Sequence, residues 1–361
     1  MAGRLGIHES GDTGEARAEQ RLDENKRPVT AIALMSGGLD SRLAARIMLE
    51  HGVRVVALNF ESVFCHGPSG GSRMSEAAKA CQALSIPLDT IPFSDELIPL
   101  VKEPPHGHGK HMNPCIDCRI AQLRLAKRHM DELGAHFLVT GEVVGQRPMS
   151  QRRDALHLIE REAGVKELVL RPLSAKLLPP TVAEQQGWVD RDGLYGFSGR
   201  SRKPQIELAA RLGVTDYPEA AGGCLLTYEG FAKKVRELIG HKAGATERDF
   251  DLLKLGRHYR LPSGAKAIVS RDEHENDRLA AMAQQGDVLF ERNDTLGPVV
   301  MLCDSCSEDD GNLAAALCVS HSKLGGASTG QVRYYDVGGG GHVARTEAKP
   351  LDNATLSAMR I

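Results

Sequence analysis

The sequence has no long hydrophobic run. No segment approaches the roughly 18 to 20 consecutive apolar residues that a membrane-spanning helix needs, and the first thirty residues are charged, without an apolar signal core. Neither export nor membrane insertion is indicated, so we expect a cytoplasmic protein without a membrane partner. Residues 1–28 are rich in Gly, Glu, Arg and Asp and poor in large apolar side chains, which predicts a mobile N-terminal tail.

A dominant charge is also absent. Lys and Arg number 45 against 47 Asp and Glu, so the net charge is −2 and no overall field favours nucleic acid. Any such binding must use local basic patches, and these occur at Arg119, Arg124, Lys127 and Arg128, at Arg147, Arg152 and Arg153, and at Arg200, Arg202 and Lys203. From the charges alone, a solvated surface and a nucleic-acid patch are equally good interpretations.

The length of 361 residues, with 41% hydrophobic residues, predicts two domains with real cores. From residue 29, short apolar runs alternate with longer helical stretches, as in a parallel sheet covered on both faces. We expect a doubly wound α/β domain over residues 29–240, with strands at 30–35, 53–60, 88–93 and 136–140. Beyond residue 241 we expect a smaller β-rich α+β domain over 245–361, with strands at 266–270, 299–302, 314–320 and 331–337.

The most informative segment follows the first predicted strand and reads Ser36-Gly37-Gly38-Leu39-Asp40-Ser41. Two adjacent glycines let backbone N–H groups turn toward one point, and the start of the following helix adds its positive dipole end. This geometry holds a phosphate chain, with hydroxyl donors from Ser36 and Ser41 and a magnesium ligand in Asp40. A Gly-rich connection that only joins strand to helix is the alternative interpretation.

With this string after its first strand, the sequence resembles the PP-loop ATP-pyrophosphatase superfamily. Members of that superfamily split ATP between the α and β phosphates and transfer AMP to an oxygen. The resemblance implies ATP and Mg²⁺ as cofactors. It also implies that the end of the second strand reads adenine and ribose, through Leu58, Asn59 and Phe60.

A second pattern narrows the substrate. Gly141-Glu-Val-Val-Gly-Gln-Arg-Pro-Met-Ser-Gln, followed by Leu170-Arg-Pro-Leu, is similar to a motif near the nucleotide in tRNA 4-thiouridine synthases. The resemblance implies that the crevice between AMP and the uracil ring is bordered by Gly141, Glu142 and Gln146. A capping loop at a polar strand end is the alternative interpretation.

Eight cysteines without a signal peptide indicate reduced thiols rather than disulfides. Cys115 and Cys118 form a CxxC at the expected start of a helix, where the dipole and nearby cations favour thiolates. Cys224 follows two glycines, which let its turn approach another loop closely. A CxxC plus one remote cysteine resembles the pattern of tRNA thiolation enzymes that hold a 4Fe-4S cluster by three thiolates and bind hydrosulfide at the open iron. This resemblance implies Cys115, Cys118 and Cys224 as metal-binding and catalytic residues.

Three alternatives stay open for these thiols. Cys115 or Cys118 could form a persulfide and disulfide pair with Cys224, as in cluster-independent 2-thiouridylases. The thiols could bind zinc together with His106, His108 or His111, or they could be structural.

The other cysteines are less informative. Cys303 and Cys306 form a second CxxC, which is either a zinc site with Cys318 and His321 or a pair of buried thiols. Cys65 and Cys81 are interpreted as core residues.

Together these patterns predict a tRNA sulfurtransferase that adenylates a uridine carbonyl and makes 4-thiouridine with sulfide or a sulfur-donor protein. The alternatives are 2-thiouridine synthesis, adenylation of a small molecule, and a non-enzymatic RNA-binding module. The segment 256–262 resembles a small RNA-binding domain of ribosome-associated proteins, so the C-terminal domain is a candidate RNA clamp. The sequence leaves open the thiolated position and whether the protein is a homodimer.

Overall fold

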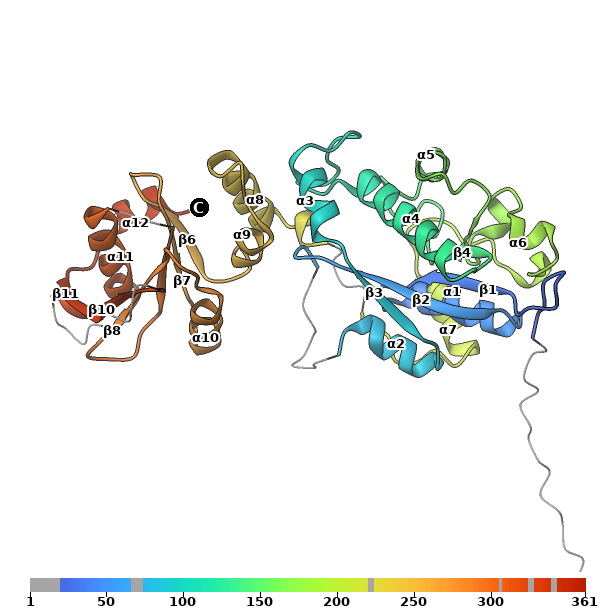
Figure 1. The fold of residues 1–361 in the computed structure, drawn as a ribbon, viewed down its shortest axis with the longest axis horizontal. Helices are drawn as coiled ribbons and strands as arrows, with labels where there is room; N and C mark the ends of the chain where they lie inside the picture. Colours follow the sequence, from blue (N-terminus) through green and yellow to red (C-terminus); the bar gives the residue numbers. More distant parts are fainter. Residues whose placement is uncertain (1–19, 66–73, 220–223, 305–306, 324–327, 339–342) are drawn as a thin grey trace, which may run out of the picture. The chain divides into compact units, whose positions relative to one another are not determined.

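The computed structural model of the protein describes residues 20–65, 74–219, 224–304, 307–323, 328–338 and 343–361. The chain divides into two compact units that are each built from separate stretches (Figure 1). The first unit contains residues 1–60, 68–91 and 119–220, and the second contains residues 61–67, 92–118 and 221–361. This division differs from the single boundary between residues 240 and 245 that the sequence suggests.

The first unit is a doubly wound α/β fold, which confirms the predicted fold class. Its strands are β1 (Thr30–Leu34), β2 (Arg54–Glu61), β3 (Leu88–Pro92), β4 (Phe137–Val139) and β5 (Val169–Leu170). They form one sheet in the order β3-β2-β1-β4-β5, in which β1 pairs in parallel with both β2 and β4. The strand order reverses between β1 and β4, which makes this position the switch point of the sheet. Ligands of such sheets bind beyond the carboxyl ends of the strands at the switch point.

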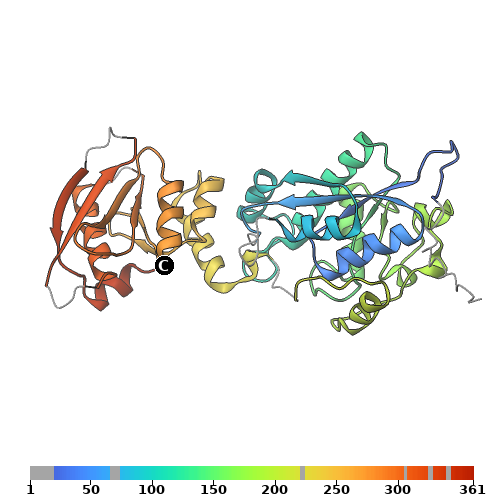
Figure 2. The same ribbon diagram turned by 90° about the horizontal axis from the view of Figure 1, so that it is seen from below.

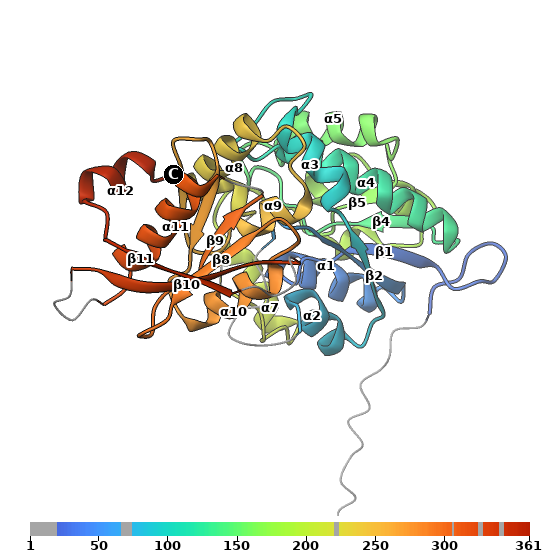
Figure 3. The ribbon, with the colours of Figure 1, turned by 60° about the vertical axis from the view of Figure 1, so that its left-hand side comes forward.

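Helices cover both faces of this sheet. They are α1 (Leu39–Glu50), α2 (Glu76–Leu84), α4 (Cys115–Glu132), α5 (Arg153–Ala163), α6 (Val182–Gln185) and α7 (Lys203–Arg211), with short 3-10 turns at Ala175–Leu177 and Arg191–Gly193. Figures 1 and 3 show α4 and α5 on one side of the sheet and α1, α2 and α7 on the other. The strands are apolar on both faces for this reason, and the successive β1 residues Ala31, Ile32 and Ala33 are all buried.

The predicted tail is too long at its C-terminal end. Leu22 and Pro28 form an antiparallel bridge, and the backbone N–H of Arg21 donates to the carbonyl of Gly52 over 2.9 Å. Asp23 is buried and accepts a hydrogen bond from the Arg27 backbone at 2.7 Å. Residues 20–28 therefore pack onto the first unit, whereas residues 1–19 lie outside the described part of the chain.

The second unit is an α+β fold around an antiparallel sheet (Figures 1 and 2). Its strands are β6 (Arg257–Arg260), β7 (Lys266–Val269), β8 (Val288–Arg292), β9 (Val300–Cys303), β10 (Gly330–Asp336) and β11 (Val343–Ala348). Their order is β11-β10-β8-β9-β7-β6. The helices are α3 (Ser94–Lys102), α8 (Glu229–His241), α9 (Glu247–Leu252), α10 (Glu273–Met282), α11 (Glu308–Ser320) and α12 (Asn353–Met359), with a 3-10 turn at Leu225–Thr227.

Both faces of the antiparallel sheet are covered. Val269 and Leu302 point into a core shared with α11 and α12, whereas the alternate residues Ile268 and Met301 point into a second core shared with α9 and α10. Strand residues on this sheet are therefore apolar on successive positions rather than alternating.

One predicted strand is wrong. Residues 314–320 lie inside α11, which begins at a capping box where Ser307 and Asp310 each bond the other's backbone. The run from Ala314 to Val319 is completely buried, so its hydrophobicity has no periodicity that separates helix from strand. Among the described residues, no helix is long and apolar enough to cross a bilayer.

Candidate nucleotide site and cysteine loops

The Ser36–Ser41 segment turns sharply between β1 and α1. Gly37 has φ of +79°, and a Cβ atom built there would lie 2.2 Å from the backbone carbon of Glu76. Only glycine therefore fits, both for its conformation and for its approach to the start of α2. Gly38 is the N-cap of α1, and Ser41 donates to its carbonyl over 2.9 Å. The first N–H groups of α1 have no partner within the helix and supply an anion-binding end.

Arg42 stabilises this loop, and no pattern in the sequence indicates its role. Its side chain is only 2% exposed and donates through Nε to the carbonyl oxygen of Gly37 at 2.8 Å. It also reaches the carbonyl of Glu76 at 3.4 Å. Arg42 thus occupies the carbonyl oxygen of Gly37, so that this oxygen does not face a bound anion.

The ends of β1 and β4 meet at this loop. A Cβ atom on Gly141, which follows β4, would lie 2.4 Å from the backbone carbon of Asp40. Glycine at position 141 thus lets the segment after β4 approach the first turn of α1 at the switch point of the sheet. The structure brings together residues that are about a hundred positions apart in the sequence, as the predicted crevice requires.

Asp40 is held by a chain of two amides. Gln146 donates to Asp40 Oδ2 over 2.8 Å, and Gln205 on α7 donates to Gln146 Oε1 over 3.1 Å. Gln205 is fully buried, so its amide fixes which end of the Gln146 side chain faces the carboxylate. Sequence reasoning found Asp40 and Gln146 but missed Gln205, whose partner is 59 positions away.

The other carboxylate oxygen of Asp40 is available for a ligand. Oδ1 is buried and has no hydrogen-bond partner among the described residues. Burial raises the pKa of Asp40, although the hydrogen bond from Gln146 and the charges of Arg202 and Arg147 oppose this shift. A buried carboxylate oxygen without a partner costs free energy that a bound cation removes. The site therefore fits Mg²⁺ at Asp40 beside a phosphate chain on the loop.

Glu142 lies in a buried ion-pair network. Its side chain is 2% exposed and accepts from Arg119 at 2.9 Å, from Arg171 at 3.0 Å and from Thr140 at 3.0 Å. Burial by itself raises the pKa of Glu142, but the two guanidinium groups outweigh it and lower the pKa to about 2. Arg171 also bonds Glu160. With both oxygens engaged, Glu142 fixes the end of β4, and a direct contact with AMP or uracil stays a prediction.

The predicted adenine-reading residues differ in burial. Leu58 is fully buried, and its carbonyl accepts from Met35 at 2.8 Å, so its side chain serves the core. Asn59 and Phe60 are half-buried at the end of β2, which is adjacent to β1. Their contact with adenine and ribose stays a prediction.

Three cysteines come from neighbouring segments of the second unit. Cys115 and Cys118 lie in the first turn of α4, and both are half-buried, as is Cys224. The backbone N–H of Met112 donates to the carbonyl of Leu226 over 3.3 Å, which joins the stretch before Cys115 to the stretch after Cys224. The structure thus supports the predicted approach of the two loops.

The described residues contain no group of three His, Cys, Asp or Glu side chains placed to hold a metal ion. The three thiols have the donor type that an iron–sulfur cluster needs, but they are not arranged as a ready ligand set. Two of the three histidines proposed for zinc have other partners. His106 bonds Asp117 at 2.7 Å and His108 bonds the carbonyl of Val101 at 2.9 Å.

The remaining cysteines divide into two kinds. Cys81, Cys303 and Cys318 are buried, and burial raises the pKa of Cys303 and of Cys318 to about 12. Cys65 is exposed, so its interpretation as a core residue is wrong. Its neighbour Phe64 accepts a backbone hydrogen bond from Leu225 at 3.0 Å, which places Cys65 beside the Cys224 segment. Cys306 lies outside the described residues.

Comparison with known families separates two parts of the chain. Residues 28–176 match the family described as thiamine biosynthesis protein (ThiI). Residues 256–358 match the family described as NFACT protein RNA binding domain. The first match covers β1 to β5 with the Ser36–Ser41 loop, and the second covers the antiparallel sheet.

Individual relatives are distant. The tRNA-specific 2-thiouridylase MnmA of Xanthobacter autotrophicus is 27% identical over 256 residues, which are 66% of this chain and 62% of the relative. A 4-thiouridine synthetase in complex with RNA and ATP is 23% identical over 52% of this chain and 42% of its own, with a TM-score of 0.35. The U34-tRNA thiolase NcsA of Methanococcus maripaludis is 14% identical over 64% and 76%, with a TM-score of 0.31.

The chain spans less than two thirds of the length of the thiouridylase. The matched segments nevertheless agree with the observed fold, because the switch-point loop lies in one of them and the antiparallel sheet in the other. The chain is thus similar to the ThiI family over residues 28–176, which contain the parallel sheet, and to the NFACT RNA-binding family over residues 256–358, which contain the antiparallel sheet.

Proposed function

We propose that this protein activates a carbonyl oxygen of a tRNA uridine with ATP and replaces it with sulfur. The observation that carries the proposal is the loop at the switch point of the sheet, where the left-handed turn at Gly37 leads into the start of α1 beside an unpartnered buried oxygen of Asp40. The family of the C-terminal segment supports RNA as the substrate. The relatives among tRNA thiolation enzymes support sulfur as the incoming group.

The reaction has two substitutions. The uracil carbonyl oxygen attacks the α-phosphorus of ATP, the bond between this phosphorus and the bridging oxygen breaks, and pyrophosphate leaves. Sulfide then attacks the ring carbon, the carbon–oxygen bond breaks, and AMP leaves. In this scheme the Ser36–Ser41 loop binds the β and γ phosphates, and Asp40 holds the Mg²⁺ that neutralises their charge.

The surrounding residues keep Asp40 and the strand ends in place. Gln146 and Gln205 orient the Asp40 carboxylate so that Oδ1 faces away from the amides. Glu142 and Arg171 fix the backbone after β4, which contacts Asp40 through Gly141. Second-sphere bonds of this kind set the geometry of a metal ligand.

For the second substitution we propose Cys115, Cys118 and Cys224 as the sulfur-transfer residues and C4 of the uridine as the target. A 4Fe-4S cluster held by these three thiolates would supply a coordination site for the sulfur donor. The second candidate is a persulfide on one thiol. Its outer sulfur is released as a disulfide forms between Cys224 and a CxxC cysteine. This candidate is favoured by the backbone bond that joins the two loops and by the absence of a ready metal ligand set among the described residues.

The first test separates adenylation from metal-independent ATP binding. Asp40→Ala should lower tRNA-dependent pyrophosphate release by about 10² to 10³, because an electrostatic stabiliser of the phosphates is lost. Asp131→Ala removes an exposed carboxylate that pairs with Lys127 on α4, and it should leave the rate unchanged. Free uridine and small carboxylates with ammonia are the competing acceptors. Normal pyrophosphate release by Asp40→Ala, or release that does not need tRNA, would refute the proposal.

The second test concerns the cysteines. Cys115→Ser, Cys118→Ser and Cys224→Ser should each abolish thiolated tRNA while pyrophosphate release continues, because the thiols act after adenylation. Iron and sulfide analysis of anaerobically purified protein distinguishes the two mechanisms. Iron-free protein that makes thiouridine selects the persulfide pair, and digestion of the product tRNA with mass spectrometry assigns C4 or C2.

A further inference from the structure

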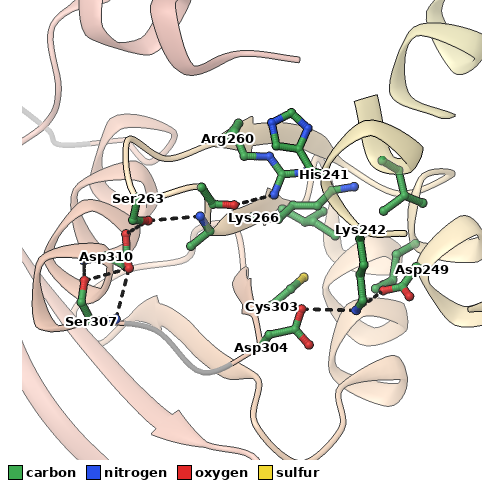
Figure 4. A pocket seen from close by; sticks show the side chains of 15 residues that line it. His241, Lys242, Asp249, Arg260, Ser263, Lys266, Cys303, Asp304, Ser307 and Asp310 are labelled. Atoms are coloured by element: carbon green, nitrogen blue, oxygen red, sulfur yellow. Dashed lines mark hydrogen bonds and ion pairs between the residues drawn. The ribbon is translucent and has the colours of Figure 1, made fainter. Parts of the chain in front are cut away.

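A cavity in the second unit has no place in the reaction above. It has a volume of about 550 Å³, within the usual range of small-molecule pockets. It lies between α8 and α9 on one side and the edge of the antiparallel sheet with the start of α11 on the other (Figure 4). Leu238, Leu252 and Ile268 give it an apolar wall.

The acidic side chains of this pocket are already satisfied. Lys242 bonds Asp249 at 2.9 Å and Asp304 at 3.3 Å. Asp310 accepts from Ser263 at 2.5 Å and from the Ser307 hydroxyl at 2.8 Å. Figure 4 shows these bonds as dashed lines around the pocket. The carboxylates therefore do not make the pocket a cation site.

Lys266 is different. Its side chain lines the pocket, the residue is 9% exposed, and no described residue forms a hydrogen bond or ion pair with its ammonium group. On the sheet it stands directly opposite Arg260 on one neighbouring strand and Cys303 on the other. Arg260 is itself engaged, since it donates to Glu237 at 2.6 Å and to the carbonyl of Gly264 at 2.7 Å.

The charges of Glu237 and Asp249 favour the charged form of Lys266, but each carboxylate is bonded to another cation, Glu237 to Arg260 and Asp249 to Lys242. Like charges directly opposite each other on a sheet destabilise it, so Arg260 adds to the cost of burying the ammonium. Burial raises the pKa of Cys303 to about 12, which keeps this thiol neutral. Burial also lowers the pKa of Lys266 itself. An unpartnered buried cation of this kind is stabilised when a ligand brings an anion into the pocket.

We propose that this pocket binds one nucleotide of RNA, with the phosphate on Lys266 and the base or ribose against Leu238, Leu252 and Ile268. A nucleotide combines a single negative charge with a flat, largely apolar ring, which is what one ammonium beside an apolar wall accommodates. The inference rests on the proposed function in taking RNA as the source of the nucleotide. A free nucleotide has the same chemistry and is the other source.

The experiment uses the full chain and two probes, an end-labelled tRNA transcript and uridine 5′-monophosphate. Lys266→Met keeps the length and apolar stem of the side chain but removes its charge. Lys323→Met is the matched control, because Lys323 is an exposed lysine of the same unit and its loss changes the net charge equally. Ala265→Phe fills the pocket without changing any charge, and so serves as a second variant.

We expect Lys266→Met to weaken tRNA binding at least about tenfold and to lower the slope of log K against log salt by about one, as for a lost phosphate contact. Its melting temperature should rise, since a buried unpartnered charge is removed. Ala265→Phe should weaken binding similarly, and Lys323→Met by less than about twofold. If Lys266→Met also loses its affinity for uridine 5′-monophosphate, the pocket binds free nucleotides as well as RNA.

Unchanged affinity of both Lys266→Met and Ala265→Phe for both probes would overturn the inference. Failure of the proposed function gives a different result. Pyrophosphate release depends on the first unit, so a protein that releases none but still loses tRNA affinity in Lys266→Met would keep the pocket and refute the thiolation reaction.

Discussion

Glu142 offers the sharpest test of the packing beneath the nucleotide site. Glu142→Gln keeps the shape and the hydrogen-bonding oxygen but removes the charge that compensates Arg119 and Arg171. The pKa of Glu142 is lowered from 4.5 to about 2, and each tenfold change in proton affinity corresponds to about 1.4 kcal/mol. The folded protein should therefore lose about 3 kcal/mol, which agrees with the cost of breaking a buried ion pair.

The sign of the pH dependence follows from the direction of the shift. Because folding lowers the pKa of Glu142, its contribution is complete above pH 4.5 and disappears as the pH falls toward 2. The difference between wild type and Glu142→Gln should be full at pH 7 and should shrink below pH 4.5. Asp154 provides the comparison, since its pair with Arg152 is exposed and Asp154→Asn should have little effect at any pH.

Urea unfolding followed by tryptophan fluorescence measures this difference in the first unit alone. Trp188 is the one tryptophan of the sequence and stacks on Phe137 of β4 at a ring separation of 6.3 Å. Equal losses for Glu142→Gln and Asp154→Asn, or a Glu142→Gln loss that does not change between pH 7 and pH 3, would refute the electrostatic account.

Two further variants test the nucleotide site. Gly37→Ala should destabilise the protein more than Gly164→Ala. Both residues have positive φ, which costs a residue with a Cβ atom about 1–2 kcal/mol, but only Gly37 lacks space for that atom against Glu76. Urea unfolding of the two variants measures the difference. Gln205→Leu should lower the rate of pyrophosphate release about tenfold at limiting Mg²⁺ and less at saturating Mg²⁺. Gln185→Leu, on the exposed side of α6, should leave the rate unchanged. An equal effect of Gln205→Leu at all Mg²⁺ concentrations would argue against a role of Gln205 in positioning Asp40.

The sequence was informative where chemistry is local. The Ser36–Ser41 loop carries its conformation in consecutive residues, because two glycines and the strand before them fix the turn. The sheet order was also predictable in kind, since alternating apolar runs and helices indicate a parallel sheet. The meeting of Gly141 with Asp40 then follows from the rule that strand ends gather at one edge.

The positioning residues could not be found in this way. Arg171 and Gln205 bond partners 29 and 59 positions away, and a buried arginine or glutamine, Arg42 included, looks like a surface residue in a sequence. The helix over 308–320 was missed because a uniformly buried segment has no polar face. Lys266 gives no signal at all, since only the structure shows that its strand neighbours leave it without a counter-charge.

The interleaving of the two units limits how the protein can be dissected. A fragment that stops at residue 220 keeps every strand of the parallel sheet but loses Leu225 and Leu226, whose backbones bond Phe64 and Met112. The segment at Phe64 and the stretch before the CxxC would then lose these backbone bonds. Under the proposed function, such a fragment is expected to release pyrophosphate from ATP but not to transfer sulfur, so truncation at this point does not separate the two units cleanly.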